Sequence, residues 1–286
     1  MISPSRIAHW PPLLRAIAFI AGVIVGWLPF ALPFYWLSAQ GKLPGGDLAP
    51  TALLYLFFLG LLPRWERKIH HIQHPWHYIG LTDRVSVLVP LVRGVCIGLA
   101  SVGILAGLQV MFGWAEVSLV NQNWAGLVLA GSLTAMAVGW AEELLFRGWL
   151  LRELEQGSSA TTALVGTSLI FALAHFIKPL DVILATLPQF FGLLLLGLIL
   201  GWARRTSVLG GNGGTTTSLG LPIGLHSGLV WGYYILSVGD LLAPTAAVPD
   251  WVTGRDGNPM AGMLGVILLG GLAMWFRHQA HRKSPS

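Results

Sequence analysis

The chain has 286 residues, of which 54% are hydrophobic and only 10% are charged, and its mean hydropathy is +0.68. Soluble domains carry about 25% charged residues, so this composition excludes an ordinary soluble protein and indicates an integral membrane protein. The sequence pI of about 9.7 fits attraction to anionic lipid headgroups. The lipid bilayer is therefore the expected partner, and no nucleic-acid partner is needed to explain the basic balance.

Eight apolar stretches along the chain are candidates for membrane-spanning helices, because a span requires about 20 residues. They cover residues 13–39, 48–63, 86–112, 124–151, 161–177, 181–203, 221–239 and 260–276. We therefore predict an all-α membrane protein, a bundle of about eight transmembrane helices around an intramembrane polar site. None of the polar connections is long enough to fold alone, so residues 1–286 are predicted to form one polytopic membrane domain.

The distribution of Lys and Arg predicts how this bundle is oriented, because cytoplasmic loops carry an excess of both residues. With the N-terminus in the cytoplasm, all of the 17 Lys and Arg residues except Lys42, Lys178 and Arg255 fall on the cytoplasmic side. We therefore predict a multi-pass protein with both termini in the cytoplasm.

Two polar connections between the apolar stretches have distinctive compositions, although neither composition specifies a single function. The basic connection after the second stretch contains four histidines, which are His70, His71, His74 and His77. We interpret it as a segment at the headgroup level, with a metal site as the alternative. The glycine-rich residues 209–220 are predicted to be a flexible linker, with a mobile gate over a site as the alternative.

The fourth apolar stretch contains three ionisable residues, Glu142, Glu143 and Arg147. Each such charge costs about 2.5–3.5 kcal/mol inside a membrane on insertion scales, so the group indicates a functional site. Glu143 and Arg147 are four residues apart and should pair on one face of a helix. Glu142 points about 100° away and lacks a helical partner, which suits a general base. An ion-pair network that joins helices is the alternative.

Two histidines lie in other apolar stretches, His175 in the fifth and His226 in the seventh. Either one alone would be unremarkable as a core residue, but buried polar groups need partners. The acids, Arg147 and these histidines are therefore expected to converge. A glutamate and a histidine that activate water would form a hydrolytic site, whereas Glu142, His175 and His226 could also bind zinc. Spacing alone does not separate these two possibilities.

The motifs Glu142-Glu143-Leu-Leu-Phe-Arg147 and Phe171-Ala-Leu-Ala-His175, followed by His226 in a later stretch, resemble those of a known family. This is the CPBP family of intramembrane proteases, which contains the CAAX prenyl endopeptidases of the Rce1 type and the bacterial Abi proteins. The resemblance covers about residues 125–239. It implies an intramembrane endopeptidase that cleaves a membrane-associated or lipidated peptide near the cytoplasmic side.

The resemblance also implies a role for each site residue. Glu142 would activate water with His175 orienting it, Glu143 would pair with Arg147, and His226 would stabilise the oxyanion. A metal-free glutamate mechanism is favoured, so no cofactor is expected, and zinc stays an open alternative. One position departs from the family pattern: Val230 stands where the motif H-x-x-x-N places an asparagine that would help to bind the oxyanion.

Two other functions are compatible with the same residues. A catalytically weak membrane scaffold or partner-binding protein on the same fold is favoured by Val230. A transporter could use the buried charges as an ion path, although the sequence lacks the inverted repeat of broken helices that many transporters show.

Overall fold

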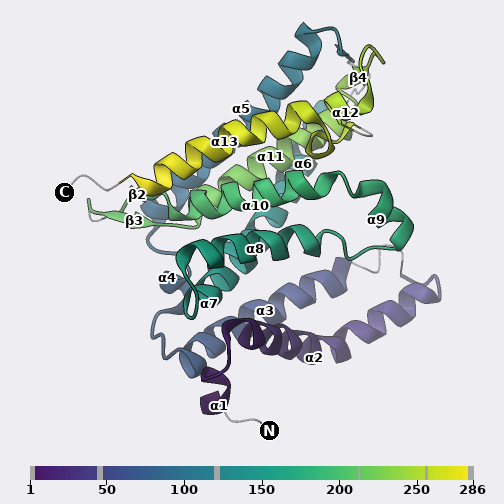
Figure 1. Ribbon diagram of the computed structural model, residues 1–286. Coiled ribbons are helices and arrows are strands. Elements are labelled where there is room, and N and C mark those ends of the chain that lie inside the picture. The colour runs from purple at the N-terminus through teal and green to yellow at the C-terminus, as the bar shows by residue number, and fades with distance from the viewer. Residues whose placement is uncertain (1–3, 44–47, 119–122, 212, 255–256, 283–286) are drawn as a thin grey trace.

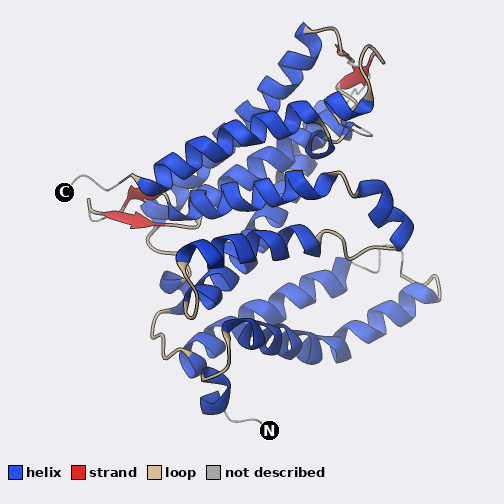
Figure 2. Cartoon of the chain, in the orientation of Figure 1, coloured by secondary structure: helices blue, strands red, loops and turns tan. Residues whose placement is uncertain are grey.

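The computed structural model describes residues 4–43, 48–118, 123–211, 213–254 and 257–282. Helices form most of this part of the chain, and two short two-stranded sheets complete it (Figure 2). Each of the eight predicted apolar stretches is largely helical. The fourth contains a π-helical segment within one continuous run, and the sixth is bent before Gln189. The long elements are α2 (Pro12–Ala39), α3 (Leu48–Ile69), α5 (Arg84–Met111), α6 (Trp124–Glu143) with η1 (Leu144–Leu150) and α7 (Leu151–Glu155), α8 (Ala160–Ala174), α9 (Leu180–Thr186) with α10 (Gln189–Arg205), α11 (Gly220–Ser237) and α13 (Met263–His281).

Short elements lie at the two ends of the bundle (Figure 1). The helix α4 (Pro75–Tyr78) and the hairpin of β2 (Ser207–Leu209) and β3 (Thr215–Thr217) lie near α7 at one end. We call this the basic end, because it also holds the arginine-rich ends of α3 and α10. The opposite end holds α9, α12 (Asp250–Thr253), η3 (Pro259–Ala261) and the sheet formed by β1 (Ala115–Val117) and β4 (Leu242–Pro244), and α1 (Pro4–Ala8) precedes α2.

Judged by helix length and composition, the described chain has fewer candidate membrane spans than the sequence predicts. In the described part of the chain, four helices are long and apolar enough to cross a membrane: α2, α3, α5 and the continuous run from α6 to α7. The bent pair α9 and α10, with axes 74° apart, would make a fifth. The predicted eight spans are thus not confirmed as spans, because α8 has only 15 residues and Pro188 breaks the sixth stretch.

Close packing of glycine faces places α11 in the interior of the bundle. Gly224 lies so close to α5 that a Cβ atom there would be 1.9 Å from the carbonyl oxygen of Leu91, and Gly228 similarly faces Val95. Small residues allow helix backbones to approach in this way. Because α11 is enclosed, His226, which lies on this helix, is only 4% exposed.

A buried ionic network fastens the α2–α3 hairpin to α7. Glu153 Oε1 accepts a hydrogen bond from Arg15 Nε at 2.5 Å. Glu153 Oε2 accepts one from Trp65 Nε1 at 3.2 Å and lies 2.8 Å from His70 Nε2. His71, His74 and His77 are exposed, as an interfacial segment requires, whereas His70 belongs to this network.

The predicted flexible linker is partly a hairpin. Strands β2 and β3 pair antiparallel, with Ser207 opposite Thr217 and Leu209 opposite Thr215. Gly210, Gly211, Gly213 and Gly214 lie between the two strands, and the linker interpretation was wrong for the strand residues. The gate interpretation stays a prediction.

Candidate active site

The adjacent acids lie at a change in helix type. Glu142 and Glu143 are the last residues of α6, and the π-helix η1 begins at Leu144. The uninterrupted apolar stretch predicts one regular helix here, and the residue types from Leu144 to Leu150 do not indicate the wider π-helical turn. Short π-helical segments occur frequently at functional sites.

Glu143 and Arg147 form the buried pair that their spacing predicts. Arg147 Nη1 donates a hydrogen bond to Glu143 Oε1 at 2.8 Å, and Nη2 donates to the carbonyl oxygen of Gly197 at 3.1 Å. The guanidinium carbon also lies 4.3 Å from the centre of the Phe171 ring, a distance at which cation–π attraction operates. The two side chains are 0% and 2% exposed, so the pair is a fixed element that α10 and α8 enclose.

His226 joins this pair to the free acid. Its Nδ1 atom lies 2.8 Å from Glu143 Oε1, and its Nε2 atom lies 3.9 Å from Glu142 Oε2. An ionised Glu143 accepts a hydrogen bond from Nδ1–H, which leaves Nε2 directed toward Glu142. A carboxylate on one ring nitrogen sets the tautomer and orientation of an imidazole. Helix periodicity pairs Glu143 with Arg147 alone, so the contact between Glu143 and His226 was not predicted from the sequence.

Glu142 lies between the two predicted histidines. His175 Nδ1 is 2.8 Å from the carbonyl oxygen of Phe171, which orients the ring, and His175 Nε2 is 4.0 Å from Glu142 Oε2. Glu142 Oε2 is buried yet has no hydrogen-bond partner among the residues that the structure describes. Separations of 3.9 and 4.0 Å are too long for direct hydrogen bonds and suit a bridging water.

The level of Glu142 and His175 follows from a tight helical hairpin. Glu142 stands 13 positions before the end of α7 at Glu155, and His175 stands 15 positions after the start of α8 at Ala160. The two helices run antiparallel and rise by about 1.5 Å per residue. The side chains therefore meet at the same depth, about 20 Å from the turn.

A family model described as type II CAAX prenyl endopeptidase Rce1-like matches residues 123–232. This segment is an Rce1-like domain. Comparisons with curated proteins and with solved structures found no match. The match confirms the resemblance that the two motifs and His226 indicate, and its range contains all five predicted site residues, which are Glu142, Glu143, Arg147, His175 and His226.

Helices α5 and α13, which lie outside the Rce1-like domain, help to enclose a cavity that three of these residues line. The cavity has a volume of about 310 Å³, and Glu142, His175 and His226 line it together with apolar side chains of α5, α10, α11 and α13. Val230 also faces the cavity, so the position where the family motif has asparagine contributes no hydrogen-bond donor from its side chain.

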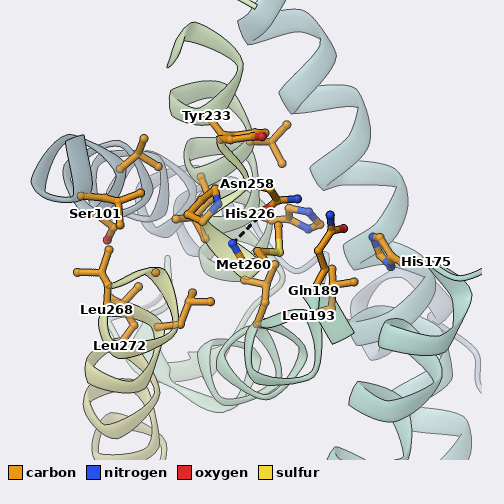
Figure 3. A pocket seen from close by; sticks show the side chains of 18 of the residues that line it. Ser101, His175, Gln189, Leu193, His226, Tyr233, Asn258, Met260, Leu268 and Leu272 are labelled. Atoms are coloured by element: carbon orange, nitrogen blue, oxygen red, sulfur yellow. Dashed lines mark hydrogen bonds between the residues drawn. The ribbon is translucent and has the colours of Figure 1, made fainter. Parts of the chain in front are cut away.

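Two amide side chains in this cavity were missed by sequence reasoning. Gln189 and Asn258 both line it, and in Figure 3 their amides and the ring of His226 face the same part of the space. Asn258 Oδ1 accepts a hydrogen bond from the backbone N–H of Met260 at 3.0 Å, which leaves its Nδ2 group as a donor for a ligand. Both residues lie next to helix ends, where no periodic pattern marks them.

The donor geometry bears on the zinc alternative. Zinc binds nitrogen and oxygen ligands at about 2.0–2.2 Å, so its ligands must lie close to one another. Glu142, His175 and His226 do not bring their donor atoms within 4.8 Å of one another, whereas Glu66, His70 and Glu153 are a described group that does. Zinc at Glu142, His175 and His226 therefore stays an untested alternative to a water between the acid and the histidines.

Proposed function

We propose that this protein is an intramembrane endopeptidase in which Glu142 activates a water molecule that attacks a peptide bond. The observation that carries the proposal is the unpartnered Glu142 carboxylate oxygen, 3.9 and 4.0 Å from two imidazoles, at the wall of an apolar cavity. The substrate class is a membrane-associated or lipidated peptide, because the match is to a family of CAAX prenyl endopeptidases and apolar walls favour apolar ligands.

In the proposed mechanism, a water molecule bridges Glu142 and His175. Glu142 removes a proton from this water as the oxygen attacks the peptide carbonyl, and it then carries the proton to the leaving amine. A general base must reach its proton directly or through one water. His175 orients the water, since its own ring is held by the carbonyl oxygen of Phe171.

The developing oxyanion needs donors on the opposite side. We propose His226 as one donor, with its ring held in place by Glu143, whose Oε1 atom lies 2.8 Å from His226 Nδ1. We propose the Asn258 amide as a second donor, in place of the asparagine that is absent at position 230. A single oxyanion donor is worth about 10²–10³ in rate, so these residues decide whether the site is fast or slow.

Cleavage assays test the assignment. The purified protein in detergent is incubated with lipidated and transmembrane peptides beside His175→Ala, His226→Ala and a matched control, Glu116→Gln, which changes an exposed carboxylate outside the cavity. We expect the control to cleave like wild type and the histidine variants to lose about 10²-fold or more. Histidine variants as active as wild type would refute the assignment. A wild type that cleaves no peptide would favour the scaffold function, for which Val230 is the supporting observation.

The side on which the cavity opens is a separate proposal. Lys178 is exposed and lines the cavity, and it follows α8 away from the basic end. The Lys/Arg bias predicts that the basic end faces the cytoplasm. We therefore propose that the cavity opens away from the cytoplasm, in contrast to the cytoplasmic opening that the resemblance implied.

Sided labelling tests this orientation. In a Cys96→Ser background, Lys178→Cys and Arg277→Cys are each exposed to a membrane-impermeant maleimide on intact cells. We expect labelling at position 178 and none at position 277 until the cells are opened. The reverse pattern would place the cavity mouth and the cytoplasm on the same side.

A further inference from the structure

A second pocket lies at the basic end, far from the cavity of Glu142. It has a volume of about 150 Å³ and is lined by residues of α7, the C-terminal end of α10 and β3. Three of its six lining residues are arginines; the set is Leu151, Arg152, Glu155, Arg204, Arg205 and Thr217.

The charges in this pocket do not balance. Glu155 Oε2 accepts a hydrogen bond from Arg152 Nη1 at 3.1 Å, and Glu155 Oε1 accepts one from Arg205 Nη2 at 2.7 Å. Both oxygens of this carboxylate are therefore used by two of the three arginines. Among the described residues, no carboxylate forms an ion pair with Arg204. One carboxylate against three guanidinium groups leaves a net charge of two positive units.

Arg204 is the buried member of the set. It is 3% exposed, and its Nη2 group donates to the neutral carbonyl oxygen of Ile79 at 3.2 Å. Its Nε–H group is buried without a hydrogen-bond partner in the described chain. A buried charge without a partner of opposite sign is costly, so this guanidinium lacks the ligand that its burial calls for.

The chain makes room for the Arg204 guanidinium with a glycine. Gly80 has a φ of +105°, and a Cβ atom there would lie 2.6 Å from Arg204 Nη2. Any side chain at this position would be strained by the backbone and would strike the guanidinium. The loop after α4 thus holds Arg204 in place, and the arginine does not extend freely to the membrane surface.

We propose that this pocket binds a phosphate group, carried by an anionic phospholipid headgroup or present as free phosphate. Guanidinium groups match phosphate oxygens in charge and in forked geometry, and Thr217 adds a hydroxyl group to the lining. The headgroup source fits a basic end at the cytoplasmic leaflet, where anionic lipids gather around basic pockets. The proposal does not depend on peptidase activity.

Thermal unfolding in detergent tests the proposal, because a ligand that binds the folded state raises its stability. The probes are dioctanoyl phosphatidylglycerol, dioctanoyl phosphatidylcholine and inorganic phosphate, titrated against wild type, Arg152→Gln, Arg204→Gln and the control Arg277→Gln. Arg277 is an exposed arginine outside the pocket. We expect stabilisation of wild type and the control, and an apparent affinity about tenfold to hundredfold weaker in each pocket variant.

The probes separate the two sources. Stabilisation by phosphatidylglycerol alone identifies a lipid headgroup, and equal stabilisation by inorganic phosphate identifies free phosphate. If Arg204→Gln fails to fold, the affinity of Arg152→Gln, which changes a partly exposed residue, tests the proposal. The proposal is overturned if neither anionic probe stabilises wild type, if phosphatidylcholine acts equally well, or if Arg152→Gln responds like Arg277→Gln.

Discussion

Two buried centres in this protein use the same residue types for different ends. In the first, Glu153 lies among Arg15, His70 and Trp65, and both of its oxygens have partners. In the second, Glu143 lies between Arg147 and His226, while its neighbour Glu142 faces a cavity with an unpartnered oxygen. A saturated carboxylate joins helices, whereas a free one beside a cavity is available to a ligand. Unpartnered carboxylate oxygens occur at both centres, on Glu66 beside the first and on Glu142 at the second, but Glu142 lines the cavity. Access to a cavity therefore distinguishes the candidate active site from the ionic fastening.

The largest expected effect separates the two centres directly. Glu142→Gln keeps the size of the side chain and removes the proposed base, so peptide cleavage should fall by about 10²–10⁴-fold while the unfolding temperature stays near that of wild type. Glu153→Gln should do the reverse, lowering the unfolding temperature while the folded fraction cleaves at the normal rate. Rates and unfolding temperatures of both variants, measured in one detergent, check this. Equal activity loss in both would erase the distinction.

Loss of the central cation should weaken both centres similarly. Arg147→Met leaves Glu143 buried without its cation, and Arg15→Met does the same to Glu153. Breaking a buried pair by removing one partner costs about 3–5 kcal/mol. We expect a large fall in unfolding temperature for both variants, with cleavage per folded molecule lost only for Arg147→Met. A stable Arg147→Met protein would show that this ion pair contributes little to the fold.

The oxyanion side gives a smaller and reversible effect. Asn258→Ala removes the proposed amide donor, so kcat should fall by about 10²–10³-fold with little change in KM. Val230→Asn in that background introduces an amide from α11 into the same cavity and should restore part of the rate. Leu229→Asn, which changes the neighbouring cavity residue, is the matched control. Asn258→Ala with wild-type kcat would remove Asn258 from the mechanism.

The smallest expected effect is a change in stability from Asp83, the exposed residue that caps the N-terminus of α5. Hydrogen bonds from the Ser86 hydroxyl and backbone N–H lower the pKa of Asp83 from 3.8 to about 2. Because the folded-state pKa is the lower one, this stabilisation is full above pH 3.8 and is lost as pH falls through about 2. Asp83→Ala should therefore unfold at a slightly lower temperature than wild type at pH 6. The gap should close near pH 2, and thermal unfolding at both pH values measures it.

The contacts that sequence reasoning predicted correctly are those within single helices. The pairing of Glu143 with Arg147 and the separate direction of Glu142 both follow from helix periodicity. The helical stretches follow from apolar runs of the right length. The number of spans could not be predicted as well, because helices such as α8 and α10 are short or bent and their depth depends on their neighbours.

The helical segments, the Lys/Arg-rich end of the bundle and the acid that lacks a helical partner follow from the amino-acid sequence alone. The tertiary structure alone decided that His226 contacts Glu143, that Asn258 and Gln189 enter the cavity, and that Arg204 is buried without an anion. The physical reason is the range of the interactions. Periodicity encodes neighbours three and four residues apart, whereas these contacts depend on how closely α11 packs on α5 and how tightly the hairpin before α8 turns.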